Sequence, residues 1–298
     1  NYINQIEQDS LGFIWIATID GLNRYDGNSF QIYRKSNRNP ASGPVANYIE
    51  QLKIDQNQHL LLATNKGLST YDPKSDSFNH TDLFSGLNPN SISNIIDGPK
   101  DQKIITTFEG DIQVLNADSV LATFTHHLSD PDALSSTRIS ALAMQGDSIL
   151  WVGHFDRGLD KIDLRRNRIT SLEISSPSFP ANINSLFTDE AGNLWVGSNA
   201  GIRVITTDAD TLKLQASEHP KLGLSDGNVL CFEKGPFGNL WIGTRNGGLN
   251  ILNSERFLKD QKIELKWFRP EQDGSSVFNR TVSSLKLSKD GYMWIGLP

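Results

Sequence analysis

The chain has 298 residues, of which 37% are hydrophobic and 21% are charged, and this content excludes a disordered tail or a fibre. No apolar run is long enough to span a membrane, and a single cysteine, Cys231, excludes an internal disulfide. The 34 acidic residues outnumber the 28 Lys and Arg, giving a net charge of −6 without any basic block, so we expect neither nucleic acid nor membrane as a partner.

The strongest feature of the sequence is a short hydrophobic pattern that recurs along its whole length. Each copy centres on a large apolar residue, and in chain order these anchor residues are Trp15, Leu61, Ile104, Trp151, Trp195, Trp241 and Trp294. Successive anchors are 43 to 53 residues apart. Glycines lie at fixed distances before and after most anchors, which indicates a turn on either side.

Four short apolar segments follow one another in each repeat unit. In the first unit they cover about residues 3–8, 13–18, 22–26 and 29–34. Segments of about five residues that are rich in Ile, Val, Leu and aromatics, and that end at Gly, Asp or Asn, are typical of strands. A four-stranded unit that repeats every ~40–50 residues predicts one blade of a β-propeller.

Seven anchors predict an all-β fold, a seven-bladed β-propeller of four-stranded antiparallel blades that forms a single domain over residues 1–298. The sequence stops at Pro298, just after the second strand of the seventh unit, so we expect a last blade truncated after its second strand. We therefore interpret the chain as part of a longer protein. The five anchor tryptophans are expected to fill the wedges between neighbouring blades.

One face of this propeller is the expected place of function. Because successive strands alternate in direction, the turns between second and third strands open on the same face as the crossovers between blades. These connections vary in length and chemistry, and recognition residues generally lie on variable loops. The candidate residues are His154, Asp156 and Arg157 in the fourth unit, Arg245 and Asn246 in the sixth, and Asn199, Arg203 and Asp20 at or beside equivalent turns.

The chemistry of these candidates favours binding over catalysis. Imidazole, carboxylate and guanidinium groups together bind a polar ligand through charge-assisted hydrogen bonds, and the alternative is a solvated hairpin with a local ion pair. His154 with Asp156 is the single candidate pair for acid–base catalysis, and it is a weak one. No nucleophile elbow or phosphate loop occurs, so we predict no catalytic residue and no cofactor. We also predict no metal, because the adjacent His126 and His127 would point to opposite faces of a strand.

The segment 8–30 carries a resemblance to a known family. It reads Gln-Asp-Ser-Leu-Gly-Phe-Ile-Trp-Ile-Ala-Thr and continues, after Ile19, with Asp-Gly-Leu-Asn-Arg-Tyr-Asp-Gly. Phased over seven units, of which the second and third are degenerate, the pattern resembles the repeat of the two-component regulator propeller family. The resemblance implies a periplasmic sensor region of a bacterial signalling protein with a histidine kinase or diguanylate cyclase output. It also implies an oligosaccharide or another small polar ligand, and further propellers of the same protein as neighbours.

Two alternative functions stay open. A propeller that acts as a protein-interaction scaffold, within a multi-propeller sensor or a homodimer, would present an apolar patch rather than a polar pocket. A propeller lyase or hydrolase would need His, Asp or Glu side chains that converge in one pocket.

Overall fold

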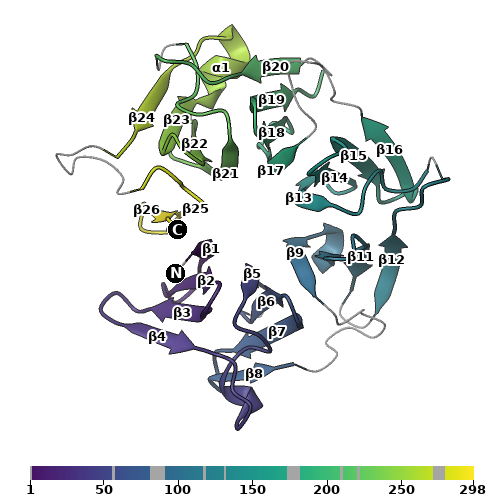
Figure 1. The fold of residues 1–298 in the computed structure, drawn as a ribbon, viewed down its shortest axis with the longest axis vertical. Coiled ribbons are helices and arrows are strands. Elements are labelled where there is room, and N and C mark those ends of the chain that lie inside the picture. Colours follow the sequence, from purple (N-terminus) through teal and green to yellow (C-terminus); the bar gives the residue numbers. More distant parts are fainter. Residues whose placement is uncertain are drawn as a thin grey trace. The chain divides into compact units, whose positions relative to one another are not determined.

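A computed structural model describes residues 2–55, 58–80, 91–116, 119–130, 132–172, 182–208, 211–219, 222–270 and 279–298. These residues form six four-stranded sheets and one two-stranded sheet (Figure 1). Within each sheet the strands pair antiparallel in chain order, so every sheet is a meander. The prediction of an all-β propeller built from four-stranded antiparallel blades is confirmed, and the seventh sheet has the two strands that were expected of it.

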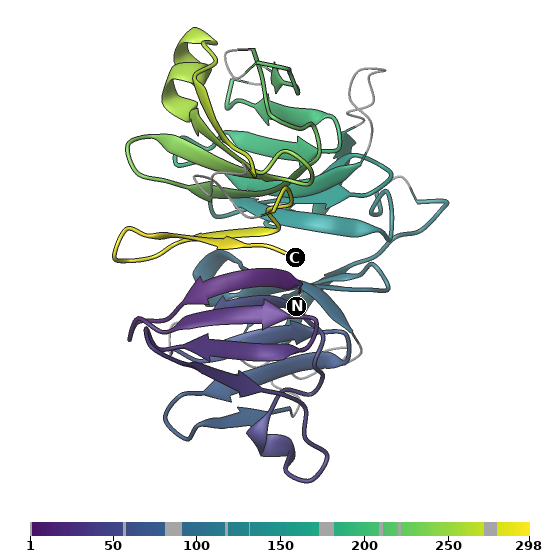
Figure 2. The same cartoon turned by 60° about the vertical axis from the view of Figure 1, so that its left-hand side comes forward.

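Contacts divide the chain into two compact units, of which the first comprises Asn1–Thr137 with Ser288–Asp290. Figure 2 shows the four strands of its first sheet side by side, in purple. Its three sheets consist of β1 (Ile3–Gln8), β2 (Ile14–Thr18), β3 (Gly21–Tyr25) and β4 (Phe30–Tyr33); β5 (Ile49–Ile54), β6 (Leu60–Thr64), β7 (Gly67–Asp72) and β8 (Ser77–Asn79); and β9 (Ile92–Asp97), β10 (Lys103–Thr107), β11 (Ile112–Leu115) and β12 (Val120–Phe124). Two 3-10 turns, η1 (Pro40–Ser42) and η2 (Pro99–Asp101), complete the unit.

The second unit comprises Arg138–Leu287 and Gly291–Pro298. Its three complete sheets consist of β13 (Ile139–Gln145), β14 (Ile149–His154), β15 (Leu159–Asp163) and β16 (Arg168–Leu172); β17 (Ile183–Thr188), β18 (Leu194–Ser198), β19 (Gly201–Ile205) and β20 (Thr211–Leu214); and β21 (Val229–Lys234), β22 (Asn239–Thr244), β23 (Leu249–Asn253) and β24 (Leu265–Phe268). The two-stranded sheet pairs β25 (Ser284–Leu287) with β26 (Met293–Gly296).

Helix α1 (Ser254–Asp260) was not expected from the sequence. It is inserted between the third and fourth strands of the sixth sheet, and the Asn253 side chain caps it by accepting a hydrogen bond from the Arg256 backbone N–H. This insertion lies within the longest interval between anchors, which separates Trp241 from Trp294.

The second strand of a sheet is its most buried part. All five residues of β2, β6 and β18 are buried, and their sequences are short, nearly continuous apolar runs. Such runs, bounded by turns, are typical of strands that are covered on both faces. Neighbouring sheets within a unit contact each other through their first strands: β1 with β5 and β5 with β9, and β13 with β17, β17 with β21 and β21 with β25. We call these first strands the inner strands.

Each complete sheet has the same irregularity near the start of its inner strand. In β5, Ile49 pairs with Thr64 and Gln51 pairs with Ala63, so Glu50 is an extra residue that forms a bulge. Bulges re-aim side chains and are frequent beside functional sites. The corresponding bulged residues of the other five sheets are Asn4, Ser93, Ser140, Asn184 and Leu230.

Three of the anchor tryptophans are buried and hydrogen-bonded. Trp15, Trp151 and Trp195 are at most 4% exposed, and each indole Nε1–H donates to the side chain six residues earlier. The Trp15 ring lies 4.9 Å from the ring of Tyr71 on β7 of the next sheet. These residues join neighbouring sheets as expected, whereas Trp241 and Trp294 remain partly exposed.

Candidate functional site

A repeated backbone hydrogen bond joins the second-to-third-strand turn of four sheets to the start of the inner strand of the same sheet. The residue four positions after the anchor donates its N–H to the carbonyl of the residue 13 positions before the anchor. This bond occurs in Asn65 with Tyr48 (3.4 Å), Phe108 with Ser91 (3.1 Å), Phe155 with Arg138 (3.0 Å) and Arg245 with Asn228 (2.9 Å). We call the residues at these two positions the rim residues.

A hydroxyl group three residues after the anchor closes the same turn. Thr18, Thr64, Ser198 and Thr244 each donate from Oγ to a backbone carbonyl at the far end of the turn, at distances of 2.7 to 3.0 Å. The glycine at that end of the first turn, Gly21, has φ +117°, a conformation that L side chains rarely adopt. The backbone below the rim is therefore uniform, while the rim side chains differ from sheet to sheet.

The fourth sheet presents three rim-face side chains of different chemistry close together. The guanidinium carbon of Arg138 lies 5.9 Å from the centre of the Phe155 ring, and Arg138 Nη1 lies 3.8 Å from Asp156 Oδ2. Arg138 is 65% and Asp156 is 37% exposed in the side chain, so this ion pair is open to solvent and weak. Arg157 follows in the same turn and is exposed.

The sixth sheet presents Arg245 and Asn246 from a turn whose backbone is held by hydrogen bonds to side chains outside the turn. The Asn246 N–H donates to Asp226 Oδ2 at 3.0 Å, and the Thr281 hydroxyl donates to the Arg245 carbonyl. Both side chains are exposed. In the fifth sheet, Asn199 is also exposed in the turn that follows β18. The second unit thus places Asp156, Arg157, Asn199, Arg245 and Asn246 at the surface of their turns, with Arg138 beside the first two.

The structure places His154 in the protein interior and away from the rim. His154 and Asp160 are both 0% exposed, and His154 Nε2 lies 2.9 Å from Asp160 Oδ2. His154 Nδ1 has no hydrogen-bond partner among the described residues. The sequence analysis paired His154 with Asp156, but the histidine occupies the position of the turn-closing hydroxyl and points to the neighbouring strand β15. It is a buried structural residue with no direct path to a ligand.

Arg203 and Asp20 also differ from the other candidates. Arg203 lies within β19, opposite Val196, and its partial burial lowers the pKa of its guanidinium group. Asp20 lies in the first unit, where its carboxylate accepts from Arg34 Nη2 at 2.7 Å. Arg203 thus lies within a strand and Asp20 in an ion pair, unlike the exposed turn residues of the fourth and sixth sheets.

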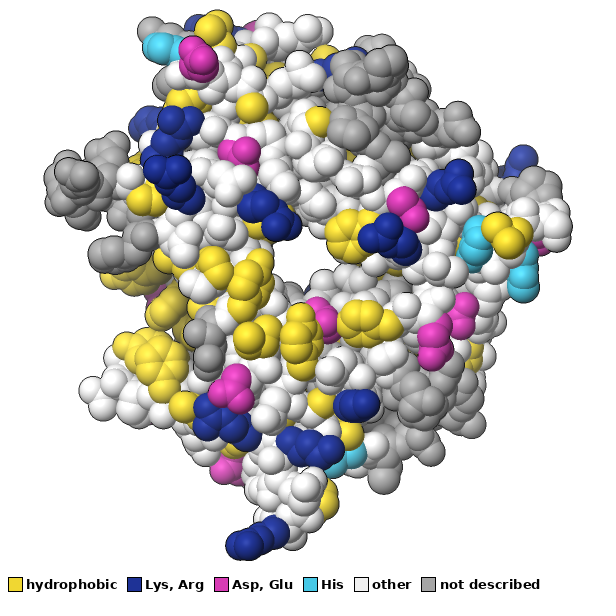
Figure 3. Space-filling view, in the orientation of Figure 1, with side chains coloured by type: hydrophobic (Ala, Val, Ile, Leu, Met, Phe, Trp, Pro, Cys, Tyr) yellow, Lys and Arg dark blue, Asp and Glu magenta, His cyan; other side chains and the backbone are white. Residues whose placement is uncertain are grey.

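The residues 13 positions before the anchors were missed by the sequence analysis. In the first unit the exposed apolar rim residues are Tyr2 (40%), Ile19 (43%), Tyr48 (38%) and Phe108 (52%). Figure 3 shows hydrophobic side chains gathered over the inner strands of this unit. The constant spacing from the anchors is a signal from which Tyr2, Tyr48 and Arg138 could have been found.

Glu50, the bulged residue of β5, has an unusual environment. Its side chain is partly buried, and within the described residues no hydrogen bond or ion pair reaches its carboxylate. Burial raises the pKa of Glu50 from 4.5 to about 7. The folded state therefore holds this proton more tightly than the unfolded chain, so the stability that it contributes is complete below pH 4.5 and is lost as pH rises through 7.

Replacing Glu50 with Gln should remove this pH dependence. Glutamine stays neutral, so we expect Glu50→Gln to raise the free energy of unfolding at pH 8 by on the order of 1 to 3 kcal/mol and to leave it nearly unchanged near pH 4. Urea unfolding of both proteins at the two pH values measures the difference. An effect of equal size at both pH values would show that ionisation of Glu50 is not its cause.

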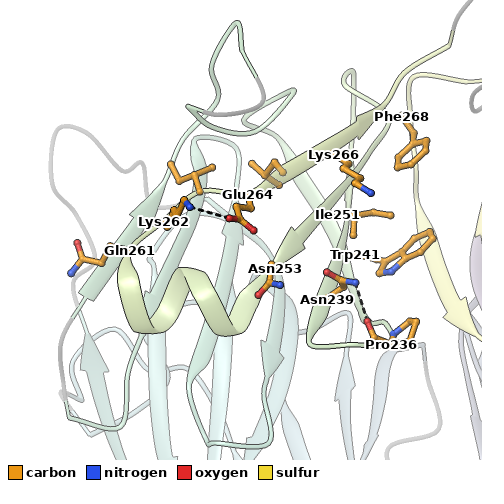
Figure 4. A pocket seen from close by; sticks show the side chains of 12 residues that line it. Pro236, Asn239, Trp241, Ile251, Asn253, Gln261, Lys262, Glu264, Lys266 and Phe268 are labelled. Atoms are coloured by element: carbon orange, nitrogen blue, oxygen red, sulfur yellow. Dashed lines mark hydrogen bonds and ion pairs between the residues drawn. The ribbon is translucent and has the colours of Figure 1, made fainter.

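An open groove lies on one face of the sixth sheet. It has a volume of about 990 Å³, and its lining includes Trp241, Ile251, Lys266 and Phe268, which Figure 4 shows as sticks. Trp241 and Phe268 are partly buried and pack against a cluster that includes Val282 and Leu285, and Met293 of β26 packs against the same cluster. The sheet β25–β26 thus covers only part of the face that presents these side chains.

The sequence analysis placed the adjacent histidines His126 and His127 on a strand. In the structure they follow β12 and lie outside it. His126 Nδ1 is hydrogen-bonded to the Leu134 carbonyl, and His127 Nε2 lies 3.1 Å from Thr125 Oγ1. Within the described ranges, no three His, Cys, Asp or Glu side chains are grouped as a metal site would require. No helix in that part of the chain is long and apolar enough to cross a membrane.

When the chain is compared with models of known protein families, two copies of its repeat match one of them. Residues 178–200 and 223–246 match the model of the two component regulator propeller family. A histidine kinase, P4, from Formosa agariphila is 55% identical over 31 residues, which are 10% of this chain and 2% of that protein.

Comparison with solved structures shows the fold over nearly the whole chain. The extracellular domain of a hybrid two component system from B. thetaiotaomicron matches with a TM-score of 0.81 and 21% identity, covering 99% of this chain and 38% of that chain. The extracellular domain of a one component system from the same organism matches with a TM-score of 0.77, 21% identity and coverage of 99% and 39%. Virginiamycin B lyase from Staphylococcus aureus is a more distant match, with a TM-score of 0.68, 13% identity and coverage of 99% and 92%. The chain thus spans less than two fifths of the length of these two extracellular domains.

Proposed function

Since the chain carries repeats of the two component regulator propeller family, we propose that it is the extracytoplasmic, periplasmic recognition region of a bacterial signalling protein. Its rim binds a small polar ligand, for which an oligosaccharide is the best candidate. The output is a histidine kinase or a diguanylate cyclase elsewhere in the same protein. The extracellular sensor domains that share this fold support the general role, and the ligand is inferred from the rim chemistry.

The observation that carries this proposal is the combination of a constant backbone with variable side chains on the rim. The same hydrogen bond holds Phe155 and Arg245 in their sheets, yet one side chain is an aromatic ring and the other a cation. Rigid presentation of varied side chains is how binding surfaces are built on repeated scaffolds. Arginine, asparagine and an aromatic ring can together hydrogen-bond the hydroxyl groups of a sugar and stack on its ring.

We further propose that β25–β26 is the inner half of a seventh blade. In the other sheets two more strands follow, and the groove over Trp241 and Phe268 is the surface that such strands would cover. Other parts of the same protein, and a second copy of it in a homodimer, are the proposed partners through which binding is relayed. A recognition role rather than an enzymatic one is favoured because His154 and Asp160 are fully buried, and no reactant can reach them without local opening.

Ligand binding by the rim is tested with a thermal-shift screen against defined plant and animal oligosaccharides. A ligand that binds only the folded state raises stability by about 2.7 kcal/mol at one hundred times its dissociation constant. For an oligosaccharide that shifts the midpoint, we expect Arg245→Ala or Arg138→Ala to weaken binding by about tenfold or more, since hydrogen bonds to charged groups are the strong ones.

The matched control for this test is Arg166→Ala. Arg166 is an exposed arginine of the same sheet as Arg138, but it lies in the turn between β15 and β16 and pairs with Asp163 there. This variant should bind the oligosaccharide like the wild type. Equal weakening by all three variants would argue against a rim site, and the absence of any shift across the panel would argue against an oligosaccharide ligand.

A further inference from the structure

We propose that Arg245, Arg269 and Arg280 form a site for an anionic group of the ligand, a carboxylate or a sulfate, on the rim face of the sixth sheet. The inference rests on the proposed recognition function and adds to it the charge of the recognised molecule. All three arginines belong to the second unit, and their side chains are exposed. Figure 3 shows Lys and Arg side chains gathered over this sheet.

The turn between β22 and β23 brings two of these arginines together. Arg245 lies in the turn, and the Thr281 hydroxyl donates to its carbonyl. The N–H of Gly248, which ends the turn, donates to the Arg280 carbonyl at 2.7 Å. Residues 280 and 281 therefore lie directly beside the turn that presents Arg245.

Arg269 reaches the same turn from the end of β24. Its Nη2 donates to the Ser225 carbonyl at 3.0 Å, and its guanidinium carbon lies 4.3 Å from the centre of the Trp267 ring. The turn packs against Ser225, because a Cβ on Gly247 would lie 2.4 Å from the Ser225 hydroxyl oxygen. A guanidinium group has five N–H donors, and among the described residues those of Arg269 have no further acceptor.

The first sheet contains the partner that this arrangement lacks. There Arg34 follows β4 by one residue, as Arg269 follows β24, and Arg34 Nη2 lies 2.7 Å from Asp20 Oδ2. Asp20 is five residues after its anchor, and the residue at that position in the sixth sheet is the neutral Asn246. A carboxylate or sulfate of a ligand would supply to Arg269 the anion that Asp20 supplies to Arg34.

The charge around the turn is positive. Of the residues that form and hold it, Asp226 is the single acid, and its Oδ2 accepts from the Asn246 N–H at 3.0 Å. Among the described residues, no Asp or Glu forms an ion pair with any of the three arginines. A cationic ligand would be repelled, and a neutral hydroxyl group would accept a hydrogen bond without balancing the charge. The site therefore favours an anionic group over the other two classes.

The test compares probes that share a saccharide backbone and differ in charge. Trigalacturonic acid is compared with its trimethyl ester, and chondroitin 4-sulfate hexasaccharide with unsulfated chondroitin hexasaccharide, by calorimetric titration at pH 7. Inorganic sulfate alone is the third arm, because it separates a free anion from one that a saccharide carries. We expect the wild type to bind the more acidic member of at least one pair about tenfold more tightly, and this preference to fall as salt is added.

Variants of the arginines should remove the preference. Arg269→Gln and Arg280→Gln should each reduce it severalfold, and the double variant should abolish it together with any binding of sulfate. Asn246→Asp, which places a carboxylate where the first sheet has one, should also reduce it. The control is Arg168→Gln, because Arg168 is an exposed arginine of the same unit that lies beside the turn between β15 and β16. This variant should keep the preference.

The inference is overturned if the wild type shows no charge preference and does not bind sulfate, or if the preference survives in the double variant. In the first case, binding of neutral oligosaccharides would leave the proposed function standing. Sulfate binding without binding of any saccharide would keep the anion site, with a free anion as its ligand, and would remove the saccharide from the proposed function.

Discussion

Replacing His154 with Ala is expected to lower the free energy of unfolding by about 3–5 kcal/mol, the range measured when one partner of a buried ion pair or hydrogen-bonded pair is removed. The imidazole and the Asp160 carboxylate are both fully inaccessible and lie 2.9 Å apart. Loss of the ring would leave a cavity and take from the buried carboxylate the partner that holds it. Asp160→Ala should be destabilising for the same reason. Urea unfolding followed by tryptophan fluorescence measures both variants.

The sixth sheet offers a matched replacement for the whole pair. Its turn has the same length as that of the fourth sheet, with Thr244 where His154 stands and Asn250 where Asp160 stands. Thr244 donates to the Gly248 carbonyl, and Asn250 Oδ1 accepts from the Ser225 N–H. The double variant His154→Thr, Asp160→Asn should therefore be more stable than either single alanine variant. If His154→Ala costs less than about 1 kcal/mol, the pair is not a structural unit and the histidine needs another explanation.

This pair also shows where sequence reasoning about the candidate site failed. Three residues of the turn 154–157 were chosen as candidates, and the exposure of Asp156 and Arg157 agrees with the polar sequence of this turn. Whether a side chain at the end of a strand points outward or inward depends on the strand beside it. Thr or Ser stands three residues after five of the other six anchors. The departure from this pattern at His154 coincides with an acid at position 160, so these two departures together were the available signal.

The fold itself followed from the repeat because its hydrophobic period is set by local physics. Each run such as 60–64 is too apolar for a surface strand and too short for a helix, and glycine turns fix its ends. Helix α1 could not be foreseen in this way, since only seven residues form it and Phe257 is its one fully buried side chain. The bulge at Glu50 likewise depends on pairing with β6, which the sequence of β5 alone does not specify.

The anchor tryptophans should contribute different amounts to the free energy of unfolding, although they occupy equivalent positions in the repeat. Trp195 is 0% exposed, its Nε1–H donates to Asp189 Oδ2 at 3.0 Å, and its ring lies 6.0 Å from that of Phe257. We expect Trp195→Ala to lower the free energy of unfolding by about 3–5 kcal/mol, as is usual for a large aromatic residue removed from a core.

Trp241→Ala should cost less, by about 1–2 kcal/mol, because a partly exposed ring loses less apolar contact when it is removed. Asp189, six residues before Trp195, accepts the hydrogen bond of its indole, but the residue six positions before Trp241 is Gly235. Among the described residues Trp241 Nε1 has no hydrogen-bond partner. The two variants make the same chemical change at the same repeat position, so each is the control for the other in urea unfolding. Equal losses would mean that the groove over Trp241 is closed in solution, as happens if further strands or a second copy of the chain covers it. Quenching of the indole fluorescence by acrylamide, compared between the two single variants, distinguishes that outcome, because a covered Trp241 would be protected from the quencher.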